Sequence, residues 1–383
     1  MAARILTTHA GSLPRPAGLI EQLAALSRRE AVDSDPIDRL VDDAVTEVVG
    51  RQHDAGIDIG NDGEQSRESF FTYVQHRMTG FGQGDHRARI WQDMLDYPEF
   101  IEMLRTQRGR TRSVSLGRPP QAVDEVRYGS TDAIDRDIAR LAMHQQRHRF
   151  VDAFMTAPSP GIIVTAMANQ HYASDTEYLA AVGAAVAVEY QRIVNAGFML
   201  QIDAPDLAME RHGAFASRSE QEFVSFVDAV VDTINAAVVG LPPNRIRLHV
   251  CWGNYDGPQT HDLPVAALLP SLYRAHVGGL LLSGANPRHE HEYKEFERQP
   301  LPAGWVLSAG VIDTTTNYVE HPEVVADRLE RVVHAVGDPA RVVASTDCGF
   351  DTAAGFRSVA PDIAWAKLAT LRAGAELATQ RLL

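Results

Sequence analysis

The chain has 383 residues, of which 45% are apolar, and it carries a formal charge of −14 at pH 7 with an isoelectric point near 5.5. This length and apolar content are enough to bury a large core, either as one barrel or as two domains. The acidic balance argues against nucleic acids and anionic membranes as partners. The sequence has no apolar run of roughly 18 residues, and its N-terminus leads directly into a strand, so we expect neither a membrane span nor an export signal. Two cysteines in the whole chain suit a reducing compartment, and we expect a cytoplasmic protein.

The pattern of apolar residues predicts strands that alternate with helices along the whole chain. The expected strands cover residues 5–8, 56–64, 161–165, 198–205, 246–251, 279–284, 306–312 and 342–348. The expected helices cover residues 16–28, 132–149, 175–195, 219–239, 263–275, 321–336 and 363–377, with one more that begins at Asp35 and another after Pro287. Asn286 and Pro287 suit the N-cap and first position of the latter helix.

Eight strands alternating with helices in a chain of this length predict an α/β fold, a (β/α)8 TIM-type barrel formed by residues 1–383 as a single catalytic domain. Residues from about 80 to 130 depart from this rhythm and include an arginine-rich run at positions 105, 108, 110 and 112. We interpret this segment as an insertion beside the site or as a contact between subunits of a homo-oligomer. A solvated basic face without a role is an equally good interpretation.

The most distinctive residues lie at the ends of two expected strands. His249 and Cys251 are two residues apart and therefore project from the same face of a strand, while Leu248 and Val250 face the other way. Cys348, the second of the two cysteines, ends another strand. One imidazole and two thiolates form a set that prefers Zn²⁺ and leaves a position open for a substrate. The alternative is that both cysteines are small buried apolar side chains.

Four motifs, in this order, resemble the cobalamin-independent methionine synthase family, specifically its C-terminal catalytic barrel in a stand-alone form. They are residues 7–16 (TTHAGSLPRP), Asp62-Gly-Glu64, Gln201-Ile-Asp203 with Pro205, and His249-Val-Cys251 with Asp347-Cys-Gly349. Relatives of this family include the zinc-dependent epoxyalkane:coenzyme M transferases. The motifs span nearly the whole chain.

The resemblance implies zinc on His249, Cys251 and Cys348 and the methylation of a thiol, as in a 5-methyltetrahydropteroyltriglutamate–homocysteine S-methyltransferase. The partners are then a small-molecule thiol, homocysteine or a similar compound, and an alkyl donor. The resemblance further implies that Gly11 and Ser12 hold the carboxylate of the thiol amino acid. Glu64 and Asp203 would hold its ammonium group. Two carboxylates favour a cation, and loop amides favour an anion, so these roles are chemically consistent.

The sequence departs from the family at three positions. A glutamate that coordinates zinc in homocysteine-using members corresponds here to Ser283, which leaves the metal centre with one negative charge fewer and predicts a donor more reactive than methyltetrahydrofolate. Thr315 stands in place of an acid histidine, so Asp313 is our candidate for the catalytic proton donor, with His171 and Tyr172 as alternatives. The tryptophan that stacks on folate is missing from residues 166–170.

Other assignments remain open at this point. Addition of coenzyme M to an epoxide would require Arg15, Arg67 or Arg288 to bind a sulfonate. A barrel that binds zinc without catalysis would have all four coordination positions closed by the protein. A decarboxylase related to the uroporphyrinogen enzymes would not need the His-x-Cys pair. The run 288–292 (RHEHE) resembles a second metal site, but helical spacing would disperse its side chains.

Overall fold

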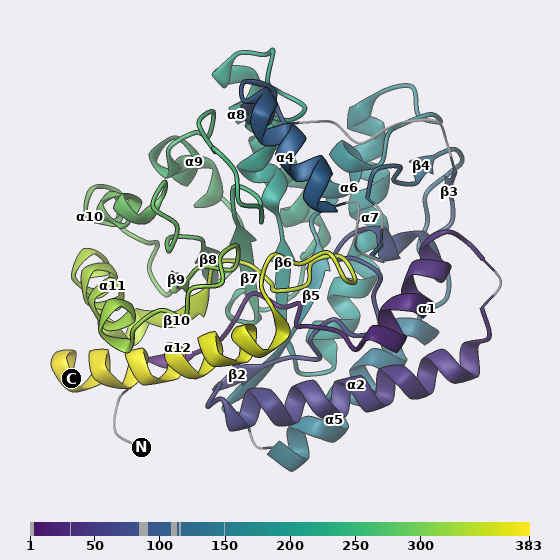
Figure 1. Cartoon of the computed structure of the whole chain (residues 1–383). Coiled ribbons are helices and arrows are strands. Elements are labelled where there is room, and N and C mark those ends of the chain that lie inside the picture. Colours follow the sequence, from purple (N-terminus) through teal and green to yellow (C-terminus); the bar gives the residue numbers. More distant parts are fainter. Residues whose placement is uncertain (1–3, 31, 84–90, 109–112, 115, 149) are drawn as a thin grey trace.

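The computed structural model describes residues 4–30, 32–83, 91–108, 113–114, 116–148 and 150–383. Eight parallel strands form a nearly closed barrel in the order β1-β10-β9-β8-β7-β6-β5-β2, and helices surround them (Figure 1). The strands are β1 (Leu6–Thr7), β2 (Ile59–Gly60), β5 (Asp152–Pro158), β6 (Met199–Asp203), β7 (Ile246–Val250), β8 (Gly279–Leu282), β9 (Val306–Ile312) and β10 (Val342–Thr346). The expected (β/α)8 barrel is confirmed.

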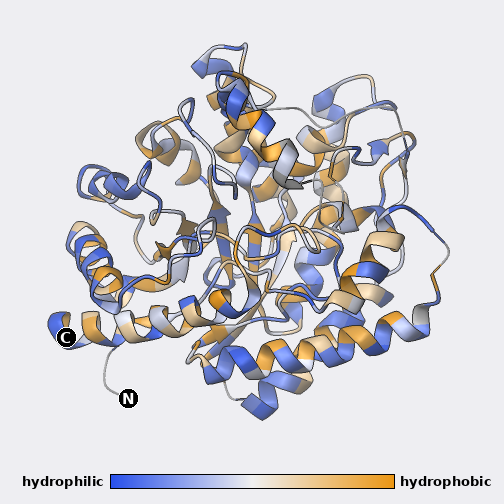
Figure 2. Ribbon diagram, viewed as in Figure 1, coloured by the Kyte–Doolittle hydropathy of each residue, from blue (hydrophilic) through white to orange (hydrophobic). Residues whose placement is uncertain are grey.

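The main helices of the ring are α1 (Ala17–Ser27), α2 (Ser34–Asp54), α5 (Asp132–His148), α7 (Asp175–Asn195), α8 (Glu220–Ala237), α9 (Val265–Leu272), α11 (Pro322–Val336) and α12 (Pro361–Leu382). Shorter helices lie in the loops: α6 (Pro160–Ala166), α10 (Glu295–Arg298), η1 (Thr72–His76), η2 (Pro205–Leu207), η3 (Met209–Arg211), η4 (Pro243–Arg245), η5 (Glu290–Lys294) and η6 (Pro339–Arg341). Blue and orange bands alternate along α2 and α11 (Figure 2), as expected for helices that bury one face. Among the described residues, no helix combines the length and the apolar character needed to cross a bilayer.

Side chains of the strands alternate between two environments. Leu248 and Val250 of β7 belong to the large core between strands and helices, as expected. Residues of the opposite parity face the barrel axis, where Ile59, Phe154 and Val343 form a small apolar cluster. Above this cluster the interior becomes polar, and this polar layer carries the site.

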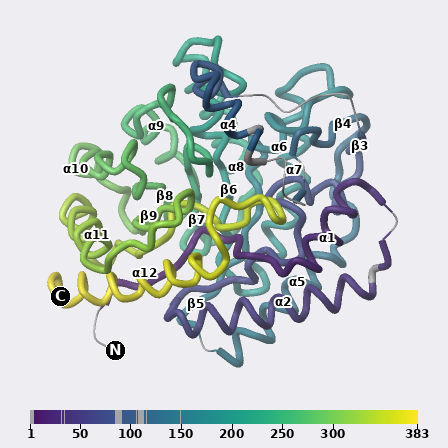
Figure 3. The backbone as a smooth tube through the Cα atoms, in the orientation of Figure 1, coloured from purple at the N-terminus to yellow at the C-terminus, as the bar shows by residue number. Residues whose placement is uncertain are grey.

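The barrel closes between its first two strands through short contacts and not through a ladder. The backbone N–H of Asp58 donates to the carbonyl of Thr7 at 3.1 Å, and the Thr8 hydroxyl donates to the carbonyl of Ile59 at 3.0 Å. The loop after β1 and the loop after β10 then run side by side across the barrel mouth (Figure 3), joined by the hydrogen bond from Phe350 N to Ser12 O at 2.8 Å. Both ends of the chain therefore contribute to the mouth.

Our expectation of a strand at residues 161–165 was wrong. The third barrel strand is β5, and the expected segment is the helix α6. Ser159 caps this helix by accepting a hydrogen bond from Ile162 N at 3.0 Å, and Pro160 occupies its first turn. A short apolar run buried on several sides has no periodicity that separates strand from helix. The helix expected after Pro287 is likewise a turn followed by the 3-10 helix η5.

The insertion expected near residues 80–130 lies between β2 and β5 and includes β3 (Phe81–Gly82), β4 (Gln121–Ala122), α3 (Gln92–Leu95) and α4 (Pro98–Arg108). Strands β3 and β4 form a two-stranded antiparallel sheet of their own. Arg110 and Arg112, half of the arginine-rich run, lie outside the described residues. Whether this segment contacts another subunit stays a prediction.

Candidate metal centre and substrate cavity

His249, Cys251 and Cys348 meet at the mouth of the barrel. Their potential ligand atoms all lie within 4.8 Å of one another, and all three side chains are buried. His249 belongs to β7, Cys251 follows it directly, and Cys348 comes two residues after β10. The register between β9 and β10 shifts at Ser345/Thr346. The additional residue lies in β9, because Ser345 pairs with Gly310 and Thr346 pairs with Ile312, so β9 bulges beside the end of β10.

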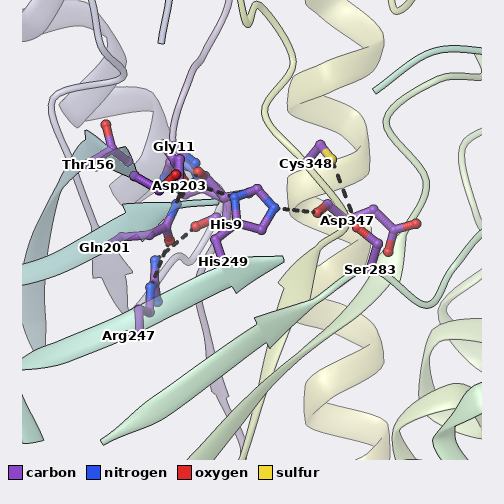
Figure 4. A network of polar contacts seen from close by, with 12 residues as sticks. His9, Gly11, Thr156, Gln201, Asp203, Arg247, His249, Ser283, Asp347 and Cys348 are labelled. Carbon is purple, nitrogen blue, oxygen red and sulfur yellow. Dashed lines mark hydrogen bonds and ion pairs between the residues drawn. The ribbon is translucent and has the colours of Figure 1, made fainter. Parts of the chain in front are cut away.

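A chain of hydrogen bonds inside the barrel orients His249 (Figure 4). The His249 Nδ1 atom lies 2.9 Å from Asp203 Oδ1. Gln201 donates to the same oxygen at 2.7 Å and accepts from Arg247 Nε at 2.8 Å. A carboxylate on one imidazole nitrogen orients the ring for a metal on the other nitrogen, and His249 Nε2 lies 3.2 Å from the carbonyl oxygen of Asp347. This arrangement is typical of metal-binding histidines.

The donor set suits zinc. The two thiols share a hydrogen bond, which holds the pKa of Cys251 well below that of an ordinary cysteine and raises the pKa of Cys348. Thiolates and a neutral imidazole are the ligand forms that Zn²⁺ selects. Within the described part of the chain, no second group of three His, Cys, Asp or Glu residues has its ligand atoms all within 4.8 Å of one another.

A cavity of about 680 Å³ opens beside this cluster. Its lining includes His249, Cys251 and Cys348 together with the expected substrate contacts Ser12, Glu64 and Asp203. A cavity of this size is ample for a small organic substrate and leaves room for a second one. The structure therefore brings together, in one space, the metal candidates and three of the four expected substrate contacts.

Glu64 is the most unusual residue of the cavity. It has a positive φ of 57°, a strained conformation for a residue with a side chain. Its Oε1 accepts from the Thr156 hydroxyl at 2.9 Å, whereas its buried Oε2 has no hydrogen-bond partner. Burial, and next the charge of Asp203, raise the pKa of Glu64 to about 7. Strain, an unpartnered oxygen and a raised pKa together mark a carboxylate held ready for a ligand.

Gly11 and Ser12 lie in the loop after β1, on the same side as Glu64. A Cβ atom on Gly11, whose φ is +132°, would lie 2.5 Å from Glu64 Oε1, so glycine is required for this carboxylate to fit. The Gly11 N–H donates to His9 Nδ1 at 3.2 Å. Ser12 lines the cavity. Their role in carboxylate binding stays a prediction.

A second cavity, of about 350 Å³, adjoins Cys348 from the other side and is lined by Ser283 and Asp313. The Ser283 hydroxyl lies 3.9 Å from Cys348 Sγ and donates to Asp347 O at 2.9 Å. Asp313 Oδ1 accepts from Thr315 Oγ1 at 2.8 Å and from the backbone N–H groups of Thr315 and Thr316. Asp313 thus closes its own loop and is not part of the larger cavity's lining. The catalytic role of Asp313 stays a prediction. The alternative proton donors His171 and Tyr172 line neither of the two cavities.

The insertion provides one wall of the larger cavity, but the sequence does not indicate which of its residues face the site. Trp91, Met94, Val114 and Leu116 line the larger cavity. Asp93 of α3 anchors this wall, because it accepts hydrogen bonds from the Tyr255 hydroxyl and from Gln259 N. These contacts join segments more than a hundred residues apart, and no local pattern announces them.

The run 288–292 is only partly dispersed. His289 Nε2 lies 3.0 Å from Asp262 Oδ2, and its Nδ1 lies 3.4 Å from Glu292 Oε2. Glu290 instead pairs with Arg331 at 2.9 Å. His289 also stacks on Trp252, with ring centroids 3.8 Å apart. This group supports the loop that follows Cys251 and is separate from the three-residue cluster.

The fold and the site define a class: a (β/α)8 barrel enzyme with a buried His/Cys/Cys cluster at the C-terminal ends of its strands. A sequence model of the family described as "Cobalamin-independent synthase, Catalytic domain" matches residues 5–366, and the chain belongs to this family. It is accordingly a methyltransferase of the cobalamin-independent methionine synthase type.

Curated relatives agree with this assignment, and a solved structure shares the fold. The chain is 25% identical over 345 residues to a methionine synthase of Sulfolobus acidocaldarius, covering 90% of this chain and 85% of the relative. It is 23% identical to that of Sulfurisphaera tokodaii, covering 98% and 93%. The structure of a B12-independent methionine synthase from Shewanella sp. W3-18-1, in complex with selenomethionine, shares the fold with a TM-score of 0.74 at 21% identity, over 99% of both chains.

Proposed function

We propose that this protein transfers a methyl group to the sulfur of a thiol amino acid, homocysteine or a close analogue, at a zinc ion held by His249, Cys251 and Cys348. We place this reaction in the cytoplasm. Zinc bound there would lower the pKa of the substrate thiol, so that the sulfur is present as the nucleophilic thiolate at neutral pH. The protein's own part is to fix the ligands and to position the amino acid.

The observation that carries the choice of an amino acid is the unpartnered Oε2 of Glu64. A buried carboxylate oxygen without a hydrogen bond is costly, and the cost is removed when a cation donates to it. Asp203 lines the same cavity and adds a second negative charge. Together they suit the ammonium group of an amino acid, whose carboxylate would then lie toward Ser12.

The contact between Asp203 and His249 gives Asp203 a further role. Its Oδ1 accepts from Gln201 and contacts His249 Nδ1, so one carboxylate both orients a metal ligand and faces the substrate. Substrate binding and metal binding are thereby coupled through a single side chain. Thr156 has the corresponding task for Glu64, since its hydroxyl fixes Oε1 and leaves the buried Oε2 without a hydrogen-bond partner.

The same charges disfavour coenzyme M as the thiol. A sulfonate needs cations, yet no Lys or Arg is found among the described residues that line the larger cavity. Arg15 donates to the carbonyls of Asp351 and Glu64, Arg67 donates to Thr156, and neither residue is part of the cavity lining. Arg288 is exposed and lines the second cavity.

X-ray absorption at the zinc edge tests the proposal when the zinc-loaded protein is titrated with homocysteine and, separately, with coenzyme M. We expect a new zinc–sulfur contribution with homocysteine only. The reverse result would support the epoxide-opening alternative. No change with either thiol, at full zinc occupancy, would support a closed zinc site without catalysis.

A further inference from the structure

Arg247 lies inside the barrel, on the N-terminal side of the candidate metal centre. It belongs to β7 and precedes His249 by two residues, so both side chains project toward the barrel interior. Its guanidinium lies over the ring of Phe154, with Cζ 4.1 Å from the ring centroid, and the residue is only 4% exposed. Its three hydrogen-bond acceptors are all uncharged oxygen atoms. Burial of a cation among neutral groups costs free energy, so we expect this arginine to have a role beyond packing.

Gln201 of β6 connects Arg247 to the site (Figure 4). Its Oε1 accepts from Arg247 Nε at 2.8 Å, and its Nε2 donates to Asp203 Oδ1 at 2.7 Å and to Ala10 O at 2.6 Å. An amide has an acceptor end and a donor end, and an arginine can only donate. Arg247 therefore requires the oxygen of Gln201, which turns the NH2 group toward Asp203. The reversed amide would place donor against donor and acceptor against acceptor, and it would lose all three hydrogen bonds.

The orientation of Gln201 decides how Asp203 and His249 interact. Because Asp203 Oδ1 accepts from Gln201, it also faces His249 Nδ1, 2.9 Å away, as an acceptor. Nδ1 then carries a hydrogen, and the opposite nitrogen, Nε2, is the one that can bind a metal. Nε2 lies 3.2 Å from the carbonyl oxygen of Asp347, the residue before Cys348, so this nitrogen is on the side of that cysteine.

We propose that Arg247 is a positioning residue of the metal centre. By donating to Gln201, it sets the direction of a hydrogen-bond chain in which Asp203 accepts from both of its neighbours and His249 presents Nε2 to the cysteines. This inference rests on the proposed zinc site, because it names the residue that orients one ligand of that site through two intervening side chains. The same chain holds the Asp203 carboxylate that we assign to the substrate ammonium.

Arg247 also holds the loop after β1. Its Nη1 donates to the Thr8 hydroxyl at 3.2 Å, and its Nη2 donates to His9 O at 3.1 Å. Gly11, which we expect to bind the substrate carboxylate, follows in this loop and donates to His9 Nδ1 at 3.2 Å. The planar guanidinium has donors at fixed angles, unlike the single nitrogen of a lysine, so one side chain can support both the metal ligand and the substrate loop.

A double-mutant cycle on zinc affinity tests whether Arg247 acts through Gln201. Arg247→Met and Gln201→Met should each lower zinc affinity in a chelator competition by about 10-fold, as changes behind a metal ligand do. The double variant should bind zinc as tightly as Gln201→Met alone, within about twofold, because the arginine has no further effect once Gln201 is gone. Losses that multiply in the double variant would overturn the proposal, since a purely structural effect of Arg247 is additive in free energy. Unchanged zinc affinity in Arg247→Met would overturn it as well.

Thr8→Val is the matched control. Valine nearly keeps the shape of threonine and removes another acceptor of the same guanidinium, but it leaves the chain from Arg247 to His249 in place. Zinc affinity should stay within about twofold of the native value. A loss as large as that of Arg247→Met would show that the arginine acts by supporting the loop after β1 and not through Gln201, against the proposal.

Nuclear magnetic resonance of the histidine hydrogens gives a readout that needs no zinc. The His249 Nδ1 hydrogen, which faces the buried Asp203, should exchange slowly with solvent, and Arg247→Met should speed this exchange about 5- to 10-fold. If the native chain binds no zinc but shows this response, the proposed metal chemistry is wrong and the positioning role of Arg247 stands. If zinc binds and the exchange rate is the same in both proteins, the positioning role is wrong.

The native chain provides a check that does not depend on the folding of any variant. Both side-chain amide hydrogens of Gln201 are donated, one to Ala10 O and one to Asp203 Oδ1, so both should exchange slowly with solvent. Slow exchange of both hydrogens would support the direction of the chain. Rapid exchange of this NH2 group would show that the amide is not held by Arg247 and would overturn the proposal.

Discussion

Replacing Glu64 by Gln should weaken substrate binding and, at pH 8, increase the stability of the folded protein. The substitution keeps the shape of the side chain, and the Thr156 hydroxyl still finds an acceptor at Oε1. It removes the charge that we assign to the substrate ammonium. A hydrogen bond to a charged group contributes about 1.5–3 kcal/mol, so affinity for an amino acid ligand should fall by about 10- to 150-fold.

The pKa of Glu64 gives the effect on stability. Burial raises this pKa from 4.5 to about 7, so in the unfolded chain the group loses its proton at a lower pH than in the folded protein. Folding therefore becomes less favourable between pH 4.5 and 7, by up to about 3 kcal/mol. Glu64→Gln lacks this penalty. We expect the variant to be more stable than the native protein at pH 8 and to lose this advantage near pH 4, although its unpartnered amide offsets part of the gain.

Two measurements check this prediction. Calorimetry with methionine, whose own charges are constant between pH 5.5 and 8, should show native binding that tightens as the pH rises to about 7 and then levels off. Urea unfolding at pH 4 and pH 8 gives the stability difference. Glu297→Gln, at an exposed position, is the matched control. If Glu64→Gln binds methionine as tightly as the native protein at pH 8, with zinc content unchanged, the carboxylate does not bind the ammonium group.

Three further predictions concern the metal, the barrel interior and the insertion. Cys348→Ala should lower zinc affinity by more than about 100-fold in a chelator competition, and retention of zinc at full stoichiometry would contradict the ligand set. Burial lowers the pKa of His9 from 6.5 to about 4. As the pH falls from 6.5 to 4, the free energy of unfolding should therefore decrease by about 3 kcal/mol more for the native protein than for His9→Gln. An equal decrease for both proteins, measured by urea unfolding at each pH, would refute this. Asp93→Ala removes the acceptor for Tyr255 and Gln259 and should speed hydrogen exchange of α3 by about 5- to 150-fold, while unchanged exchange would show that the insertion is anchored elsewhere.

Much of the site followed from local pattern. The alternation in β7 places His249 inward and Leu248 outward, and the structure shows both in those positions. Seven of the eight barrel strands were predicted within a few residues, because each combines apolar side chains with flanking turn residues. The polar residues at strand ends were predictable for the same reason, since strand ends face one side of a parallel barrel.

Other features depend on contacts between distant segments. Strict alternation from Val342 and Ala344, which face the helices, would turn Cys348 away from His249. Cys348 lies beyond the end of β10, where this alternation no longer applies, and it meets His249 there. The helical state of residues 160–166 is decided by the Ser159 cap and by burial, not by propensity. A local sequence pattern cannot predict where a strand ends against its neighbours, and it cannot predict the packing around a short apolar run.

The sequence by itself determined which side chains are available: one histidine and two cysteines at strand ends, a glutamate after Gly63, and an acidic overall charge. Only the tertiary structure decided that Glu64 has a strained backbone and one unpartnered oxygen, and that Trp91 of the insertion lines the same cavity as Cys348. The physical reason is that burial, hydrogen-bond satisfaction and shape of a cavity are properties of side chains brought together from remote positions, whereas strand alternation is a property of each segment alone.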